Sequence, residues 1–331
     1  MTGTGTGMEW PVGPLPPHVD PAAIQAKIEE GFAPVLGETW AIVAIHGGRL
    51  VFERYGAGRT ADETCRSWSV AKSVTHALAG LLVLDGKLDI HGPADVPEWS
   101  GPGDPRGAIT LDQLLRMSSG LQFAEVYVPG QPSDVIEMLF GAGQADTAAF
   151  AASFPLARPP GSYFSYSSGT TNIVSRCLAR AFGASGTAFE AFMRERLFNL
   201  LGMASATARF DAAGTFIGSS FLFATARDFA RFGQLYLQDG VWAGRRLLPE
   251  GWVQYARTPT FQQADCIDGP YGAHWWLGLA GSQTFSANGY EGQYVVVCPD
   301  RDLVLVRHGV TPEADQPLVQ AWLGELAALF G

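Results

Sequence analysis

The stretch RSWSVAKSVTHALAGLLVLDG, residues 66–86, decides the fold that we expect for this chain of 331 residues. Its apolar run has the length and periodicity of a buried helix over 69–84, ended by Asp85-Gly86. One charge interrupts the run: Lys72, one of three lysines in a chain that has nineteen arginines. A charge inside a buried helix, three residues after Ser69, calls for a chemical reason.

Ser69 and Lys72 are expected to share one face of this helix, because positions i and i+3 are neighbours. A serine hydroxyl becomes a good nucleophile when a base removes its proton. Burial lowers the pKa of a lysine, which can then act as that base, whereas an arginine stays protonated. The pair predicts a nucleophilic Ser69 activated by Lys72, although an S-x-x-K spacing is a weak signal by itself.

A second candidate site lies in PPGSYFSYSSGT, residues 159–170. A Pro-Gly turn leads to Tyr166, just before a predicted helix over 169–182. The dipole at the start of that helix favours an anionic phenolate at Tyr166. The alternative is a tyrosine that only packs at the edge of a loop.

A third candidate site lies in SANGYEGQYVVV, residues 286–297, where Gly289 and Gly292 precede an apolar strand. Glycine at the entrance of a strand allows close backbone approach. Such an approach suits an oxyanion donor or a ligand that lies along the strand. The alternative is a simple β-bulge or bend.

Strand patterns lie at both ends of the chain. Residues 39–56 indicate a hairpin with Gly47-Gly48 at its turn, and residues 285–309 indicate a second hairpin whose turn opens at Pro299-Asp300. Helical patterns occupy the N-terminal part, the middle and the end of the chain: 21–35, 69–84, 110–117, 133–140, 146–153, 169–182, 187–201, 225–239, 249–256 and 314–330. We therefore predict an α+β fold with one antiparallel sheet from both chain ends, flanked by helices, and an inserted, mostly helical region.

The expected division of the chain follows from these patterns. An N-terminal arm with the first helix takes residues 1–37. Residues 38–66 and 270–331 form the α/β sheet region, and residues 67–269 form the mostly helical region that carries the nucleophile helix.

Composition excludes several classes of protein. A net charge of −10 and a pI near 5.0 argue against nucleic acid or an anionic membrane surface as a partner. No run of 18 apolar residues occurs, and the N-terminus lacks the basic and apolar regions of a signal peptide. We therefore expect a cytoplasmic protein without a membrane span.

Cysteines and histidines give no sign of a cofactor. The four cysteines have no C-x-x-C pairing, which favours reduced thiols: Cys65, Cys177, Cys266 and Cys298. The six histidines have no metal-binding spacing, and His76 is expected to be a hydrogen-bonded core residue. Glycine-rich phosphate-binding motifs are also missing, so we expect no metal and no cofactor.

Taken together, the three motifs resemble those of the serine β-lactamase and penicillin-binding-protein superfamily. Its pattern is S-x-x-K, then Y-x-N, then K-T-G or a variant on the last strands. Ser69-Val-Ala-Lys72 matches the first motif, Tyr166-Ser-Ser168 matches the tyrosine of the second, and Ala287-Asn-Gly289 keeps the glycine of the third.

The resemblance is closest to the branch of class C-like esterases and amidases that includes 6-aminohexanoate-dimer hydrolases. It extends over residues 38–310 and includes several longer stretches: SWSVAKSV, LLRMSSGL, FSYSSGTTNIVSR, GTFIGSSFLFATARDFARFGQLYL and GYEGQYVVVCPDRDLVLVR. The resemblance implies a β-lactamase/transpeptidase-like fold and a serine hydrolase that works through an acyl-enzyme.

The resemblance also implies the roles of single residues. Ser69 would attack a carbonyl carbon, while Lys72 and Tyr166 would share the proton transfers, with either of them as the formal base. The backbone N–H groups of Ser69 and Tyr290 would form the oxyanion hole. An alternative register, with Tyr290-Glu-Gly292 as the third motif, moves the second donor to Gln293.

Four further residues are expected to contact substrate: Tyr127, Ser168, Asn288 and Gly289. Tyr127 corresponds in the branch to a tyrosine that contacts an amide substrate, and the alternative is an exposed loop aromatic. The partner is then a small ester or amide, and the sequence leaves the oligomeric state open.

Departures from the family pattern indicate the substrate class. Without the K-T-G lysine the site lacks the cation that would hold a β-lactam or peptide carboxylate. Ser168 in place of asparagine weakens recognition of an acylamide side chain. We expect weak or no β-lactamase activity and better hydrolysis of small esters or linear amides. The alternatives are a D,D-peptidase or β-lactamase, and a penicillin- or peptide-binding module without turnover.

Overall fold

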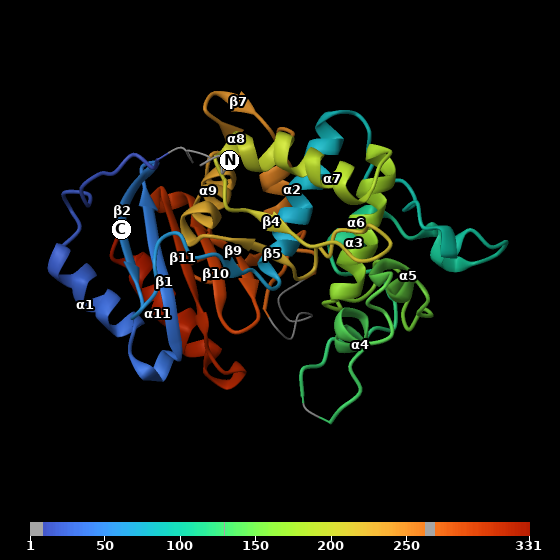
Figure 1. The fold of residues 1–331 in the computed structure, drawn as a ribbon, viewed down its shortest axis with the longest axis horizontal. Helices are drawn as coiled ribbons and strands as arrows, with labels where there is room; N and C mark the ends of the chain where they lie inside the picture. The colour runs from blue at the N-terminus through green and yellow to red at the C-terminus, as the bar shows by residue number, and fades with distance from the viewer. Residues whose placement is uncertain (1–8, 129, 262–268) are drawn as a thin grey trace, which may run out of the picture.

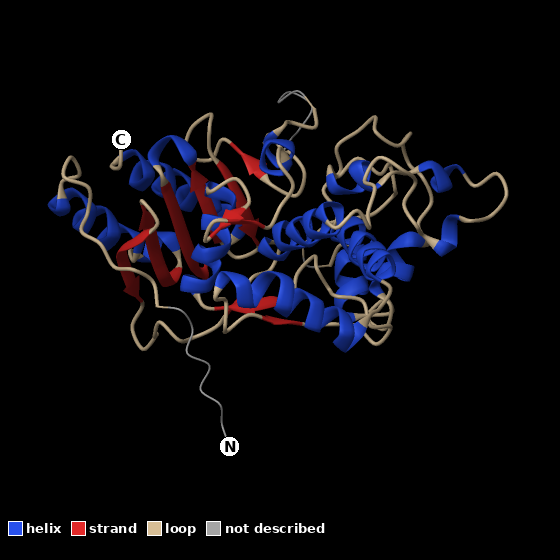
Figure 2. Ribbon diagram, turned by 90° about the horizontal axis from the view of Figure 1, so that it is seen from above, coloured by secondary structure: helices blue, strands red, loops and turns tan. Residues whose placement is uncertain are grey.

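A six-stranded antiparallel sheet occupies one half of the molecule, and helices fill most of the other half (Figure 1, Figure 2). The computed structural model describes residues 9–128, 130–261 and 269–331. The strand order is β2-β1-β11-β10-β9-β8, so strands from both ends of the chain lie side by side. This arrangement confirms the predicted α+β fold with helices inserted between the two parts of the sheet.

The strands of the large sheet are β1 (Glu38–His46), β2 (Arg49–Tyr55), β8 (Trp276–Leu277), β9 (Phe285–Gly289), β10 (Gln293–Cys298) and β11 (Leu303–Val310). Two small sheets contain β3 (Cys65–Arg66), β4 (Thr207–Ala208) and β5 (Leu222–Ala224), and β6 (Val241–Trp242) with β7 (Arg245–Arg246). The predicted hairpin with Gly47-Gly48 at its turn is confirmed as β1 and β2.

The helices are α1 (Pro21–Gly31), α2 (Val70–Leu84), α3 (Leu111–Leu115), α4 (Asp134–Phe140), α5 (Thr147–Ala152), α6 (Ser168–Phe182), α7 (Gly186–Met193), α8 (Asn199–Leu201), α9 (Ala226–Leu237), α10 (Trp252–Arg257) and α11 (Gln316–Ala328). Short 3₁₀ turns lie at Pro34–Leu36, Pro97–Trp99, Pro105–Ala108, Pro299–Arg301 and Glu313–Asp315. Each predicted helical segment overlaps at least one of the observed helices.

Both faces of the central strands are buried. On β1, Val43 and Ile45 pack into the core shared with the helical half, whereas Ile42 and Ala44 pack toward α1 and α11. The same alternation holds along β10 and β11. Strands that are covered on both sides are apolar at most positions, which explains the nearly continuous apolar runs of the sequence.

The segment 285–309 contains the predicted hairpin as β10 and β11, with its turn at Pro299–Arg301, and one additional strand, β9, that was not predicted. A tight turn separates β9 from β10, and Gly292 N donates to Gly289 O across it at 3.2 Å. Glu291 has φ +63° and Gly292 has φ +84°, so the backbone leaves the extended region there and the strand ends.

Two predicted helices also differ in detail. The first ends at Gly31 and not at residue 35, because Pro34 pushes the preceding Ala33 to an extended conformation. The segment 187–201 is helical but contains a π-helical turn at Arg194–Phe198 between α7 and α8.

Helix α2 is the central element of the interior. Every residue from Val70 to Leu82 is buried, and the helix packs against α6, β9 and β10. A helix that is covered all round needs no polar face, which agrees with its mostly apolar sequence. It begins one residue later than predicted, with Ser69 at the N-cap and the preceding Trp68 at φ +45°.

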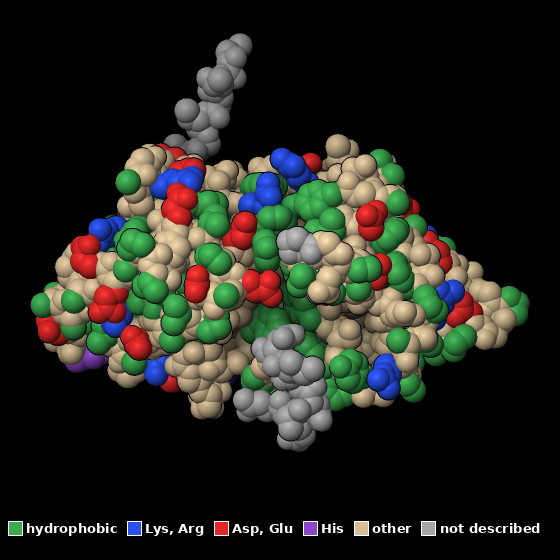
Figure 3. All heavy atoms as spheres, turned by 90° about the horizontal axis from the view of Figure 1, so that it is seen from below, with side chains coloured by type: hydrophobic (Ala, Val, Ile, Leu, Met, Phe, Trp, Pro, Cys, Tyr) green, Lys and Arg blue, Asp and Glu red, His purple; other side chains and the backbone are tan. Residues whose placement is uncertain are grey.

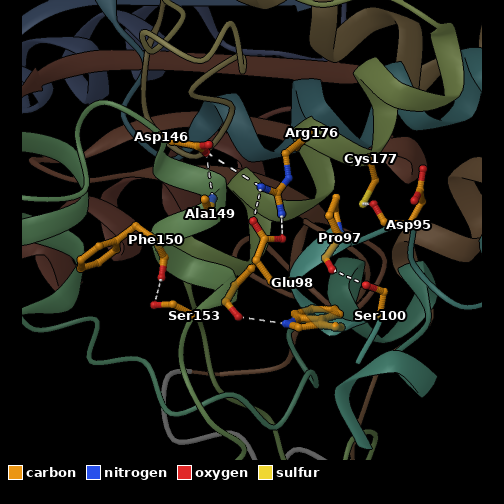
Figure 4. Close-up of polar contacts among 12 residues, drawn as sticks. Asp95, Pro97, Glu98, Ser100, Asp146, Ala149, Phe150, Ser153, Arg176 and Cys177 are labelled. Carbon is orange, nitrogen blue, oxygen red and sulfur yellow. Dashed lines mark hydrogen bonds and ion pairs between the residues drawn. The ribbon is translucent and has the colours of Figure 1, made fainter. Parts of the chain in front are cut away.

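An ion-pair network attaches the long loop after α2 to the helical half (Figure 4). Arg176 of α6 donates to both carboxylate oxygens of Glu98, at 2.8 and 2.5 Å, and lies 4.0 Å from Asp146 Oδ1. Asp146 in turn caps α5 by accepting from Ala149 N at 2.9 Å. One guanidinium thus links the loop, α5 and α6.

None of the helices in the described ranges is both long and apolar enough to cross a membrane. Cys65, Cys177 and Cys298 are buried free thiols. Cys266 and the N-terminal residues 1–8 lie outside the described residues. The division into residues 1–37, 38–66 with 270–331, and 67–269 stays a prediction.

The start of β1 gives a test of the fold. An alanine Cβ at Gly37 would lie 2.3 Å from Val310 O of β11, and Gly37 has φ +80°. Gly37→Ala is therefore expected to lower the free energy of unfolding by about 2–5 kcal/mol, since backbone strain and overpacking add. Urea denaturation measures the loss.

Gly58→Ala is the matched control, because Gly58 has φ +75° and nothing lies within 4 Å of its added Cβ. Its expected loss is about 1–2 kcal/mol, from backbone strain alone. Equal losses in the two variants would contradict the close packing of Gly37 against β11.

Candidate active site

The predicted serine–lysine pair is formed in the structure. Lys72 Nζ lies 2.8 Å from Ser69 Oγ, within hydrogen-bonding distance. Ser69 sits at the N-cap of α2, and Lys72 lies in the first turn, so one helical turn brings the two groups together. The positive φ of Trp68 turns the chain sharply just before the serine.

Lys72 is enclosed by three oxygen atoms. Besides Ser69 Oγ, its amine donates to Ser168 Oγ at 2.9 Å and to the carbonyl oxygen of Ser219 at 3.0 Å. Only 1% of the residue is exposed. Burial lowers the pKa of Lys72 to about 8, and the negative charge of Glu125 acts in the opposite direction.

Glu125 is part of the site, although it belongs to none of the three sequence motifs. Its Oε1 accepts from Ser168 Oγ at 2.6 Å and from the Tyr127 hydroxyl at 2.7 Å, and its Oε2 accepts from Ser168 N at 2.8 Å. A sequence signal existed, since Glu125 is the one charge in the otherwise uncharged stretch LQFAEVYVP.

Ser168 was predicted to contact substrate, and the structure places it elsewhere. Its hydroxyl lies between Lys72 and Glu125, accepting from the amine and donating to the carboxylate. It is 1% exposed and lines neither of the two cavities that adjoin Ser69. This position favours a role in holding Lys72 over contact with substrate.

Tyr166 lies next to the pair, as the order of the motifs predicts. It precedes Ser167, the N-cap of α6, and its ring centroid is 4.8 Å from Lys72 Nζ. Tyr271 and Trp276 pack against the ring, with centroids 5.8 and 5.3 Å away. Tyr166 and Ser69 line the same cavity.

The third motif approaches Ser69 at the end of β9. A Cβ on Gly289 would lie 2.4 Å from Ser67 O, so only glycine allows this contact. Tyr290 lines both cavities that adjoin Ser69, and Asn288 and Gly289 line one of them. Gln293 lines neither of these cavities, and its side-chain amide donates to Gly309 O inside the sheet. The geometry therefore favours Ala287-Asn-Gly289 over Tyr290-Glu-Gly292 as the third motif.

Ser69 lies where two cavities meet. The first, which we call the apolar cavity, has a volume of about 560 Å³ and extends along α4. The second, which we call the polar cavity, has a volume of about 660 Å³ and extends toward α11. The face in Figure 3 is hollowed near its centre, where hydrophobic side chains gather and acidic side chains lie beside them.

Tyr127 and Tyr290 stand at the boundary of the two cavities, and each lines both. Their rings stack with centroids 4.9 Å apart and an interplanar angle of 24°. Tyr127 is half-buried and bonded to Glu125, so it is not the exposed loop aromatic that was the alternative. Burial raises the pKa of its hydroxyl, which therefore stays protonated and donates to the Glu125 carboxylate.

His76 takes no part in the site. Its Nδ1 lies 2.7 Å from the Tyr236 hydroxyl, which confirms the predicted hydrogen-bonded core histidine. Burial lowers its pKa, so the ring is neutral. Across residues 9–128, 130–261 and 269–331, no group of three or more His, Cys, Asp or Glu side chains is placed to hold a metal ion.

In this structure a serine hydroxyl is paired with a buried lysine at the start of a helix, and this helix packs against an antiparallel sheet. These features define a serine hydrolase of the β-lactamase/transpeptidase-like fold. The family model described as Beta-lactamase matches residues 33–321. The chain therefore belongs to the beta-lactamase family.

Individual relatives agree with this assignment. A 6-aminohexanoate-dimer hydrolase of Paenarthrobacter ureafaciens is 26% identical over 294 residues, covering 84% of this chain and 74% of the relative. Among solved structures, a Bacillus anthracis protein provisionally named a 6-aminohexanoate-dimer hydrolase has a TM-score of 0.79 at 23% identity, covering 97% and 87% of the two chains. A family VIII carboxylesterase has a TM-score of 0.72 at 14% identity, covering 96% and 99%.

The burial of Lys72 predicts the pH at which its amine loses a proton. With three lysines in the chain, [ε-¹³C]lysine labelling gives three NMR signals, and loss of one in Lys72→Arg assigns it. We expect Lys72 to titrate near pH 8. Because the unfolded chain keeps this proton up to about pH 10.5, the contribution of Lys72 to the free energy of unfolding should rise between about pH 8 and 10.5.

Glu125→Gln should lower the midpoint of Lys72 further, because the carboxylate that favours the ammonium form is lost. Glu98→Gln, which removes a carboxylate bonded to Arg176, should leave the midpoint unchanged. A wild-type midpoint at or above 10, or a rise in Glu125→Gln, would contradict this description of the site.

Proposed function

We propose that this serine hydrolase cleaves small esters and linear amides through an acyl-enzyme formed on Ser69. The observation that carries the proposal is the buried amine of Lys72, 2.8 Å from Ser69 Oγ and with a pKa lowered to about 8. Such an amine is neutral in part of the molecules near neutral pH and can accept the proton of the hydroxyl.

In the acylation step, Ser69 Oγ bonds to the carbonyl carbon while its proton passes to Lys72 Nζ. The carbonyl oxygen becomes an oxyanion, and the backbone N–H groups of Ser69 and Tyr290 donate to it. Within the described part of the chain, neither amide donates to a backbone carbonyl in a turn or loop, which supports this assignment.

The intermediate then collapses as the bond to the alcohol or amine breaks, and the leaving group takes up the proton. Lys72 is bonded directly to Ser69, whereas Tyr166 faces Lys72 and the polar cavity. These contacts favour Lys72 as the base toward Ser69 and Tyr166 as the group that passes the proton to the leaving group. Water then attacks the acyl carbon, and the bond from that carbon to Ser69 Oγ breaks. Ser69 Oγ takes back a proton that originates from the water, and the carboxylic acid leaves.

The hydrogen bonds around Ser168 set the direction of proton transfer. A neutral Lys72 can donate to Ser168 Oγ and Ser219 O, which leaves its lone pair for the Ser69 hydroxyl. Ser168 can donate to Glu125 at the same time. Ser168 thereby holds the Lys72 amine in position, and Glu125 in turn holds Ser168.

The lining of the cavities supports the substrate class. Apolar side chains of the apolar cavity suit an acyl chain: Val126, Val128, Ile136, Leu139 and Phe140. The charged residues that line the apolar cavity are Asp134 and Glu137, and those that line the polar cavity are Glu125 and Glu313. Among the described lining residues neither cavity has a lysine or arginine, so a substrate carboxylate finds no cationic partner.

The names of two of the similar proteins fit the bonds that we propose this chain cleaves. A 6-aminohexanoate dimer is a linear amide, and a carboxylesterase acts on esters. Neither name points to a β-lactam, and the third motif has no lysine. The dimer also ends in a carboxylate, so the relative supports the type of bond and not the charge of the substrate. The preference for uncharged or cationic linear substrates rests on the acidic lining of the two cavities.

Hydrolysis of p-nitrophenyl acetate and butyrate tests the reaction. Ser69→Ala should lower kcat by about 10⁴-fold or more, because the nucleophile is lost. Lys72→Arg should lower it by about 10²–10⁴-fold, because a guanidinium cannot accept the proton. Nitrocefin should be hydrolysed poorly or not at all.

Equal rates for wild type and Ser69→Ala would overturn the assignment of Ser69. A mass increase on Ser69 that forms with a β-lactam or an ester and never decays would favour a binding module without turnover.

Substrate charge gives a second test with three esters of equal acyl length: p-nitrophenyl hexanoate, p-nitrophenyl 6-aminohexanoate and mono-p-nitrophenyl adipate. We expect kcat/KM for the adipate to be lower than for the hexanoate by about tenfold or more, because its carboxylate approaches Asp134 and Glu137. The 6-aminohexanoate should not show this loss.

Glu137→Gln should reduce the discrimination against the adipate, while Glu38→Gln should preserve it, because Glu38 pairs with Arg59 and lines neither cavity. A preference for the adipate in the wild type would contradict the proposed substrate class.

A further inference from the structure

Two sharp turns meet beside Ser69, and each carries one amide of the proposed oxyanion hole. The first turn leads into α2 through Trp68, and the second joins β9 to β10 through Tyr290 and Glu291. They touch closely, since a Cβ on Gly289 would lie 2.4 Å from Ser67 O. The oxyanion hole is therefore shared between the helical half and the sheet half.

Each turn contains a residue in the left-handed region that is not glycine. Trp68 has φ +45° and directly precedes Ser69, and Glu291 has φ +63° and directly follows Tyr290. Such residues cost about 1 kcal/mol or more each and persist where the surrounding contacts hold them. Both proposed donors thus adjoin a strained backbone position.

The side chains of these two residues are bonded to each other. Trp68 Nε1 donates to Glu291 Oε2 at 2.8 Å. The Trp68 ring also packs edge-on against the Tyr290 ring, with centroids 5.6 Å apart and an interplanar angle of 88°. One hydrogen bond therefore connects the residue before the first amide with the residue after the second.

The sheet holds the second turn from behind. Thr311 N donates to Glu291 O at 2.9 Å, and Arg307 donates to Gly292 O at 2.7 Å. Arg307 is 1% exposed, and burial lowers its pKa to about 10. The backbone of the turn is thus fixed to β11, and the Glu291 side chain extends from this fixed point to the first turn.

We propose that Trp68 and Glu291 are positioning residues whose hydrogen bond sets the separation of the two oxyanion-hole amides. The inference rests on the proposed function, because it needs the amides of Ser69 and Tyr290 as donors. The donors stabilise an oxyanion only when both lie about 2.7–3.1 Å from it, so a small shift of one turn against the other weakens binding of the transition state. Substrate binding in the ground state depends much less on this separation.

Glu291→Ala removes the acceptor, whereas Glu291→Gln retains a side-chain oxygen. For p-nitrophenyl butyrate we expect Glu291→Ala to lower kcat by about 10–100-fold with KM changed by less than about threefold. Glu291→Gln should stay within about threefold of wild type. The inhibition constant of a boronic acid that forms a tetrahedral adduct on Ser69 should rise in Glu291→Ala by the same factor as kcat/KM falls.

Trp68→Phe removes the donor from the other side. If the hydrogen bond is the cause, Trp68→Phe/Glu291→Ala is no slower than the slower single variant, so the two losses do not add. Glu38→Ala, which breaks the ion pair with Arg59 away from the site, should have wild-type kinetics. Thermal melting of each variant shows whether it is folded.

The results separate the inference from the proposed function. Equal activity of wild type and Ser69→Ala would overturn the proposed function. With an active wild type and an inactive Ser69→Ala, wild-type kcat in a folded Glu291→Ala would overturn only the positioning role. Equal losses in Glu291→Gln and Glu291→Ala, or additive losses in the double variant, would also overturn it.

Discussion

The enclosed amine of Lys72 is the constraint on which the site and its surroundings depend. A buried charge is strongly unfavourable unless it is hydrogen-bonded, so three oxygens must lie around this nitrogen. They come from the start of α2, the start of α6 and the loop before β5. The same contacts that satisfy the amine therefore fix these segments relative to each other. Burial also weakens the charge, and the lowered pKa makes the amine a base.

The order of the strands explains how the turn after β9 comes to lie beside Ser69. Strand β1 pairs with β11, so the C-terminal strands are added to a sheet that the N-terminal hairpin begins. This order brings the turn after β9 against the entrance of α2, with Gly289 at the point of closest approach. The groups around Ser69 are thus supplied by both halves, and neither half contains all of them.

Electrostatics distinguish this chain from the pattern of its superfamily. The third motif lacks a lysine, and the described lining of both cavities includes carboxylates but no basic side chain. One carboxylate, Glu125, serves the interior of the site by bonding Ser168 and Tyr127. The chain is 26% identical to a 6-aminohexanoate-dimer hydrolase over 294 residues, and the charge of its cavities comes from its own side chains.

Local sequence determined the helix of α2, the pairing of Ser69 with Lys72 and the hairpin of β1 and β2, because helical and strand periodicity fixes which near neighbours meet. It also indicated a close approach at Gly289. Only the tertiary structure decided the contacts of Glu125 with Ser168, 43 residues apart, and of Trp68 with Glu291, 223 residues apart. The tertiary structure likewise added β9 to the second hairpin, β10 and β11, whose turn the sequence had indicated. Such contacts depend on how separate elements pack, and no spacing along the chain encodes that packing directly.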